Sequence, residues 1–230
     1  MPILIIMALD TIRTTIASKI SAPIAIRLLT ACCVVGLCGF ATTLGWSIVR
    51  FAGAESGVAS HEAGIDAIRP WIGAPGLTST ALRTSLTKMA NSTDIEDARR
   101  RTADLTALLA VRPLSAIDWL SLAGMRLTTA QPTGVLAALT MSSLSGPNEG
   151  AVMLQRALFG LLEWEVLPAD ARQRVSVDLA GAVSGNIAGD GATTLAKNVL
   201  RAKLPQARSE LAGLLRARGV SADDLARIGL

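Results

Sequence analysis

The sequence contains no tyrosine, three phenylalanines and a single histidine, and aromatic residues make up 3% of its 230 residues. Strands of β-sandwiches are rich in aromatic and β-branched side chains, so this scarcity argues against that class of fold. Half of the residues are nevertheless hydrophobic, with alanine and leucine the most frequent. Both residues have high intrinsic helix propensity. The composition therefore predicts an all-α protein with a core of small and aliphatic side chains.

Cysteine and histidine are too few for a metal site of the zinc-finger kind. All three cysteines, Cys32, Cys33 and Cys38, fall in one apolar stretch, and the lone histidine is His61. Structural zinc sites need four ligands, mostly Cys and His, at short spacings. We therefore expect no metal or cofactor site, and no disulfide beyond residue 50.

Motifs of catalysis are missing as well. The glycine-rich segment 181–191 lacks the lysine of a phosphate-binding loop, and no strand is predicted before it. Glu163 and Glu165 are two residues apart, so they point away from each other on a helix and do not form a carboxylate pair. We expect no catalytic residues and a protein that is not an enzyme. An envelope enzyme, the least favoured alternative, would need polar groups that converge in a pocket.

The chain is basic, with a net charge of +4 and an isoelectric point near 9.4. Residues 1–50 hold four basic residues and one acidic residue, whereas the longer remainder holds 18 basic and 17 acidic residues. The excess positive charge therefore lies beside an apolar stretch, which has a membrane explanation. The basic run from Arg99 to Arg101 has no alternating aromatic residues on which nucleobases could stack. We expect no nucleic-acid partner.

A stretch without charge extends from Leu28 to Val49, between Arg27 and Arg50. Its 22 residues would form a helix of about 33 Å, enough to cross the hydrocarbon core of a bilayer. Trp46 lies near the far end, where an indole ring can sit among lipid headgroups. The stretch predicts one transmembrane helix, residues 28–49, in contact with membrane lipid.

More basic residues precede this stretch than follow it: Arg13, Lys19 and Arg27 come before, and Arg50 follows. Positive flanks favour the cytoplasmic side, so we expect the N-terminus in the cytoplasm and the residues after 50 outside it. In a bacterium, the chain would be a single-pass inner-membrane protein with a periplasmic C-terminal domain. Isoleucines repeat every fourth residue in the cytoplasmic arm 1–27, which predicts an interfacial helix, with a loose tail as the alternative.

Cleavage is the alternative to an uncleaved anchor. The segment Ala52-Gly53-Ala54 has the pattern of small residues that signal peptidase reads. A signal peptide would have an apolar core of about 7–15 residues and no charge such as Arg50 between the core and the cleavage site. We therefore expect an anchor, whereas cleavage after Ala54 would release a periplasmic module that binds glycans.

Small residues share one face of the predicted transmembrane helix: Cys32, Gly36, Gly39 and Thr43. Small side chains permit close packing of two helices in a membrane. This face predicts either a homo-oligomer that forms through the transmembrane helix or a surface that faces lipid.

A connector, residues 50–80, is rich in Gly, Ala, Ser and Pro, and helical patterns follow it over 81–230. In 94–111, an apolar stripe begins at Ile95, directly after Asp94, which can cap the helix. Pro113 then prevents the helix from continuing. Further helices are expected over 115–129, from Pro132 to about 145, over 150–167, from there to about 183, over 192–203 and over 205–218.

Two prolines, Pro113 and Pro147, stand at the ends of successive predicted helix pairs. Two short antiparallel helices with their turns need about 34 residues, which is both the separation of these prolines and the length of a tetratricopeptide repeat. In the window 116–149, Trp119 takes the fourth position and Leu122 the seventh, as in that repeat. The chain thus resembles the tetratricopeptide family. The resemblance implies a right-handed stack of antiparallel helix pairs that binds other proteins.

The resemblance covers roughly residues 82–183 and departs from the family pattern in places. Arg126 stands where the pattern has tyrosine, and Gly181 stands where the next window would have its late proline. Three charged residues flank the repeat turn or lie on helix faces, and we expect them to contact a protein partner: Arg126, Glu149 and Arg156.

Other side chains are expected to have structural roles. Trp119 and Trp164 occur at helix-core spacing, and Ser221 and Asp224 have the spacing of a capping box. The segments PLSAIDWLSLAGMRL and GPNEGAVMLQRALFGLLEWEVLP also resemble membrane-anchored proteins of alphaproteobacteria, some of them encoded with exopolysaccharide genes. This resemblance implies an envelope scaffold or accessory factor in polysaccharide synthesis or export, with another envelope protein as its partner.

Overall fold

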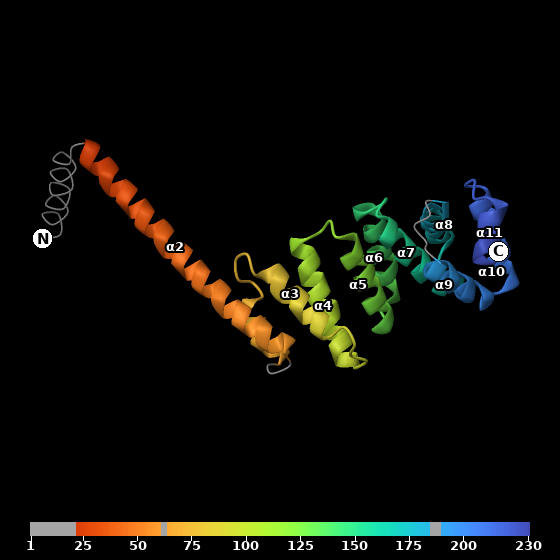
Figure 1. Cartoon of the computed structure of the whole chain (residues 1–230), viewed down its shortest axis with the longest axis horizontal. Coiled ribbons are helices and arrows are strands. Elements are labelled where there is room, and N and C mark those ends of the chain that lie inside the picture. The colour runs from red at the N-terminus through yellow and green to blue at the C-terminus, as the bar shows by residue number, and fades with distance from the viewer. Residues whose placement is uncertain (1–21, 61–63, 185–189) are drawn as a thin grey trace, which may run out of the picture. The chain divides into compact units, whose positions relative to one another are not determined.

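The structure, a computed structural model, describes residues 22–60, 64–184 and 190–230. Within these ranges, every regular element is a helix, as the composition predicts (Figure 1). The chain divides into two compact units, residues 1–67 and 68–230. The predicted interfacial helix in the arm 1–27 lies almost wholly outside the described residues, and so does His61.

The first unit contains the long helix α2 (Ala22–Ala59) and the short 3-10 helix η1 (Ile65–Ala67). The part of α2 from Ile26 to Ala59 is long and apolar enough to cross a membrane, and none of its most apolar window is buried. The predicted segment 28–49 lies inside this helix. One candidate transmembrane helix is therefore present at the expected place.

The connector expected over 50–80 is partly wrong, because α2 continues to Ala59. Extending an existing helix by one residue is far easier than starting a new helix, so residues 50–59 continue it in spite of two glycines. Burial of Phe51 and Val58 supports this extension. The described residues between α2 and Thr78, residues 60 and 64–77, contain no α-helix but hold η1 and a second 3-10 turn, η2 (Arg69–Trp71). The helical domain then begins at Thr78, three residues before the expected start.

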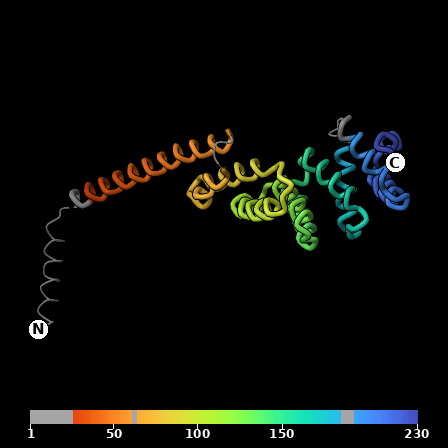
Figure 2. The backbone as a smooth tube through the Cα atoms, turned by 90° about the horizontal axis from the view of Figure 1, so that it is seen from below, coloured from red at the N-terminus to blue at the C-terminus, as the bar shows by residue number. Residues whose placement is uncertain are grey.

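The second unit is a succession of α-helices joined by short connections. These are α3 (Thr78–Lys88), α4 (Ile95–Val111), α5 (Ala116–Thr128), α6 (Pro132–Ser145), α7 (Gly150–Leu162), α8 (Ala169–Ser184), α9 (Asp190–Arg201), α10 (Pro205–Arg216) and α11 (Ala222–Ile228), with the 3-10 turn η3 (Trp164–Val166) before α8. Figure 2 shows these helices following one another along the chain from yellow to blue.

Helices that follow each other in this unit pack together: α3 with α4, α4 with α5, α5 with α6, and α7 with α8. The helices α5 and α6 are joined by three residues and contact each other, so they run antiparallel. Pro113 and Pro147 lie in the connections after α4 and α6. The helices α4 and α6 thus end before these prolines, as predicted.

Helix ends follow local sequence signals. The carboxylate of Asp94 accepts a hydrogen bond from the Glu96 amide at 3.1 Å, and Ser221 Oγ accepts one from the Asp224 amide at 3.1 Å. Both predicted caps are confirmed. Ser115 stands at the N-cap of α5 but makes no side-chain cap bond. Ile95 is exposed rather than part of the apolar stripe, because it is the first residue of α4 and precedes the buried face.

Two larger groups of buried side chains form the core. One joins α4, α5 and α6 and contains Leu105, Leu109, Leu122, Ala123, Val135 and Ala138. The other joins α7 to α11 and is built around Leu161, Trp164, Leu179 and Leu211. Trp164 is buried, as predicted, whereas Trp119 is only partly buried at the edge of the first group. The helix pairs therefore share continuous cores with their neighbours.

Candidate protein-interaction surface

Two connections of the second unit, α4–α5 and α6–α7, lie against each other. Ser145 Oγ donates a hydrogen bond to the Pro113 carbonyl at 3.4 Å. Trp119 Nε1 donates to the same carbonyl at 2.8 Å, which holds α5 against the preceding turn. A Cβ atom at Gly146 would lie 2.7 Å from Ala116 Cβ, so only glycine permits this approach. The two connections that contain Pro113 and Pro147 thus lie side by side.

Large apolar side chains are exposed where these connections meet: Val111, Leu114, Ile117 and Leu144, here called the connection edge. Leu114 is 79% exposed and Leu144 is 70% exposed. Three of them lie within seven residues of the chain, and Leu144 is next to Ser145, which bonds to Pro113. Exposed apolar residues that gather in this way are typical of sites of protein or membrane contact. The connection edge is therefore the candidate site for binding another protein.

A groove of about 440 Å³ opens beside the connection edge, lined by residues 112–117 and by Glu149. Arg112 and Glu149 bring opposite charges to its rim, while Leu114 and Ile117 bring apolar surface. Protein interfaces combine an apolar centre with a polar rim in this manner. The groove can accept an apolar side chain of a partner, and Arg112 and Glu149 can orient the charged residues next to that side chain.

The three residues expected to contact a partner occupy different environments. Glu149 is exposed in the groove, as a contact residue must be. Arg126 is only partly buried, but its Nη1 donates to the Gly134 carbonyl at 2.9 Å and its side chain lies over that glycine. Arg126 therefore closes the α5–α6 turn. Sequence reasoning missed Leu114 and Leu144, although two apolar residues next to proline turns are a usable signal.

Arg156 is not on the surface, and the expectation of a contact residue there is corrected. Its side chain is 2% exposed. Its Nε and Nη2 donate to the two carboxylate oxygens of Asp178, at 2.9 and 2.8 Å. Its Nη1 donates to the carbonyls of Ser142 and Gly146, at 3.0 and 3.1 Å. The bidentate pair compensates the buried charge, and Nη1 satisfies two carbonyls at the end of α6.

This buried network extends to a fourth helix. Ser142 Oγ donates to the Ala116 carbonyl at 2.8 Å. The connected groups therefore come from the first turn of α5, the end of α6, the middle of α7 and the last turns of α8. The cavity beside Arg156 has a volume of about 20 Å³, which is the space for roughly one water molecule. The network joins two helix pairs and leaves no room for a ligand.

The anchor residues Leu28, Trp46 and Val49 all have exposed side chains on α2. Hydroxyl groups along the helix donate to backbone carbonyls one turn earlier, including Thr43 to Phe40 at 2.9 Å and Ser47 to Thr43 at 2.9 Å. Polar groups inside a bilayer must be satisfied internally. The polar side chains of α2 are thus compatible with a hydrocarbon environment.

Metal-binding side chains do not gather anywhere in the described part of the chain, where no group of three or more His, Cys, Asp or Glu could hold an ion. Comparison with known proteins finds no match: no family model, no curated protein and no solved structure is similar to the chain. The geometry of α2 and of the connection edge is therefore the basis for assigning a function.

Proposed function

We propose that the chain is a membrane-anchored scaffold that binds another envelope protein through the connection edge. The observation that carries this proposal is the exposed apolar surface of Val111, Leu114, Ile117 and Leu144 beside a groove of about 440 Å³. Burial of apolar area at roughly 25 cal/mol per Å² is the main driving force of protein association. A partner that covers this edge removes leucine side chains from water.

The apolar helix α2 determines the cellular location of the proposed scaffold. It anchors the chain in the bacterial inner membrane, and the basic residues before Leu28 keep the N-terminus in the cytoplasm. Residues after Val49 are then periplasmic. Anchoring raises the effective concentration of the connection edge near partners in the same membrane, so a weak contact suffices. The resemblance to proteins encoded with exopolysaccharide genes supports a polysaccharide assembly as the setting.

The helix pairs α3 to α8 are proposed to form a right-handed stack of the tetratricopeptide kind. Supporting this, α5 and α7 begin one repeat length apart, and Arg83 of α3 forms an ion pair with Asp118 of α5 at 3.2 Å. The first helices of two successive pairs therefore lie next to each other, as in a helical-repeat protein. The steps from α3 to α5 and from α7 to α9 are longer than one repeat length, so any such stack is irregular.

Fractionation and protease protection test the topology. The full chain with a C-terminal tag should stay in washed membranes at full length, and the tag should become accessible to protease only when the outer membrane is opened. A soluble product that begins near Glu55 would show that the chain is cleaved and released rather than anchored. Glycan binding would then be the first function to test. A tag that stays protected would place the helical domain in the cytoplasm.

Site-specific photo-crosslinking tests the interaction surface. A benzophenone side chain at Leu144 should give a discrete adduct in membranes, whereas the same group at the exposed Thr106 of α4 should not. The variants Leu114→Asp and Glu149→Arg should weaken the adduct without unfolding the domain, and Asp170→Arg at the start of α8 is the matched control. An adduct that persists in both variants would reject the surface. Mass spectrometry of the adduct identifies the partner.

A further inference from the structure

Two arginines of α10, Arg208 and Arg216, line a groove of about 290 Å³ near the last residues of the sequence. They are eight residues apart, so they share one side of the helix and their backbones are separated by about 12 Å. Ala212, midway between them, also lines the groove, and Ser209 adds a hydroxyl group. The small alanine leaves space between the two guanidinium groups.

Arg208 has an unusual environment. Its Nε atom is buried and has no hydrogen-bond partner among the residues that the structure describes. Nearby arginines do find partners: Arg172 pairs with Glu210 at 2.8 Å, and Arg218 donates to Ser176 Oγ at 2.9 Å. A buried donor without a partner costs about 1–3 kcal/mol.

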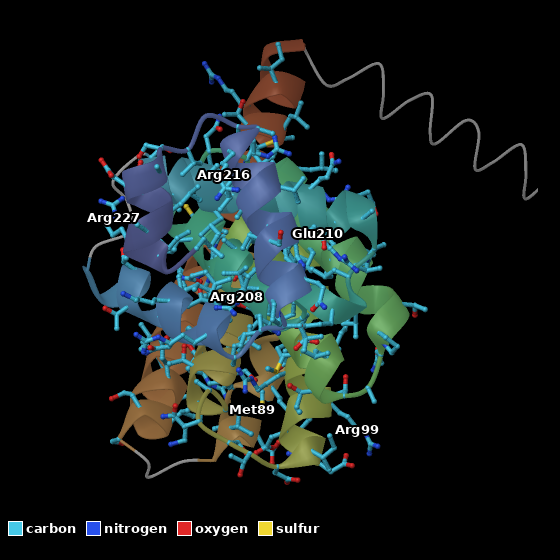
Figure 3. The ribbon with its side chains drawn as sticks, turned by 90° about the vertical axis from the view of Figure 1, so that its right-hand side faces the viewer. Met89, Arg99, Arg208, Glu210, Arg216 and Arg227 are labelled. Carbon is cyan, nitrogen blue, oxygen red and sulfur yellow. The ribbon has the colours of Figure 1, made fainter. Side chains whose placement is uncertain are left out.

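Arg208 and Arg216 are the only lining residues with charged side chains, since Gly229 and Leu230 complete the described lining of the groove with Pro205, Ser209 and Ala212. Glu210 is on the other side of α10 from Arg208 and is engaged by Arg172 (Figure 3). Asp224 of α11 is engaged by Arg227 at 2.9 Å. Arg208 and Arg216 themselves form no ion pair with any residue whose side chain the structure describes. The groove therefore favours an anionic ligand.

We propose that this groove, the α10 groove, binds an acidic peptide segment of the partner protein. In an extended peptide, two carboxylates four residues apart lie on the same side and about 13 Å from each other. That distance matches the separation of Arg208 and Arg216, and each guanidinium can form a bidentate pair with one carboxylate. Since this inference names the chemistry of a protein partner, it rests on the proposed scaffold function.

A recessed site suits a peptide better than a membrane surface. Arg208 is only partly exposed and lines the groove, so a carboxylate must enter the groove to reach its guanidinium group. Binding to anionic lipid instead uses basic side chains that extend toward a broad surface. The geometry thus favours a flexible acidic segment over lipid headgroups.

Fluorescence anisotropy tests the proposal with the full chain in a neutral detergent. The probe is the fluorescein-labelled peptide SDTVTDS, and its amide counterpart SNTVTNS is the control. The aspartate peptide should bind, and Arg208→Gln and Arg216→Gln should each weaken binding by about tenfold or more, the effect of losing a charge-assisted pair. Arg208→Lys keeps the charge but loses the planar fork, so it should also bind more weakly.

The exposed Arg201 of α9 does not line the groove, so Arg201→Gln should bind like the wild type. Absence of binding to the aspartate peptide, equal binding of the amide peptide, or an equal loss in Arg201→Gln would overturn the proposal. Displacement of the peptide by inorganic phosphate at constant ionic strength would make the site a phosphate site. Arg208-dependent binding to phosphatidylglycerol vesicles would make it a lipid site. The crosslink at Leu144 does not involve α10, so the scaffold function can stand if this proposal fails.

Discussion

Arg156 and Asp178 are charged residues of an apolar domain that are almost excluded from solvent. Their two parallel hydrogen bonds compensate for lost hydration, and Nη1 of Arg156 donates to two carbonyls at the end of α6, those of Ser142 and Gly146. Removal of one partner of such a pair leaves an uncompensated buried charge, whereas replacement of both by apolar residues does not. The pair therefore matters more for how α6, α7 and α8 fit together than for net stability.

We expect Arg156→Met and Asp178→Leu each to lower the free energy of unfolding by about 3–5 kcal/mol. The double variant should recover most of this loss, because no charge then remains unpaired. Urea unfolding of the full chain in detergent, followed by circular dichroism, measures the three values. Losses that simply add in the double variant would contradict a coupled pair.

Glu165 and Lys203 form a second pair, with 2.8 Å between Oε2 and Nζ, and Lys203 also donates to the Leu162 carbonyl. The hydrogen bond from Lys203 holds the pKa of Glu165 below its ordinary value of 4.5. A carboxylate with a lowered pKa stabilises the fold above its unfolded pKa, and this contribution is lost as the pH falls through the folded pKa. The contribution of this pair to the free energy of unfolding should thus decrease below about pH 4.5.

The variant Glu165→Gln tests this dependence. At neutral pH it should be slightly less stable than the wild type, by less than about 1 kcal/mol, because Glu165 is partly exposed and solvent screens the pair. The difference between the two proteins should shrink toward zero as the pH falls to about 3. Urea unfolding at several pH values gives the comparison. A difference that widens in acid would contradict the assigned sign.

Among the elements, α7 and α8 pack tightly against each other at Gly160. A Cβ atom there would lie 2.2 Å from Val175 Cγ2, which is far inside any permitted contact. The approach brings the Arg156 side of α7 within reach of Asp178 on α8. A residue without a side chain is thus required in the last turn of α7, although glycine otherwise weakens a helix.

We expect Gly160→Ala to destabilise the domain by about 1–3 kcal/mol, since the added methyl group overpacks a buried contact. Gly213→Ala in α10 is the matched control, because a Cβ there meets nothing within 4 Å. The control should be neutral or stabilising by up to about 1 kcal/mol, the difference in helix propensity. Thermal unfolding of both variants distinguishes packing from propensity, and equal shifts would contradict the steric explanation.

Local signals in the sequence predict the elements well. Asp94, Ser221 and Pro132 mark helix starts because caps and first-turn prolines act through the nearest backbone groups. The place of Arg156 could not be predicted, because its burial depends on Asp178, which is 22 residues away and on another helix. The extension of α2 to Ala59 was missed because small residues suit a connector as well as a helix. Prediction from the sequence is therefore limited more by contacts between residues far apart in the chain than by helix formation.

For the whole molecule, the proposed function separates anchoring from recognition. Residues 68–230 form a compact unit with its own core, whereas α2 supplies the apolar helix. A chain that holds a folded binding unit on a membrane anchor gains partner capture from local concentration rather than from affinity alone. Another single-pass anchor should then be able to replace α2 without loss of partner binding.

We expect residues 68–230 alone to be soluble and helical, yet to give much less of the Leu144 adduct at the same expression level. Fusion of these residues to an unrelated single-pass anchor of the same orientation should restore the adduct. Immunoblots of the adduct in membranes and in periplasmic extracts measure both effects. Full capture by the soluble unit would show that tethering contributes nothing.

The network around Arg156 also has a mechanical consequence. Its hydrogen bonds join α5, α6, α7 and α8, residues 116–184, across two helix pairs. If α2 is fixed in a membrane and a partner holds the α10 groove, as proposed above, the chain between them is under tension whenever the two move apart. Helix pairs that share only apolar surface would detach one after another under load. These four would yield together, releasing up to about 240 Å of extended chain in one step.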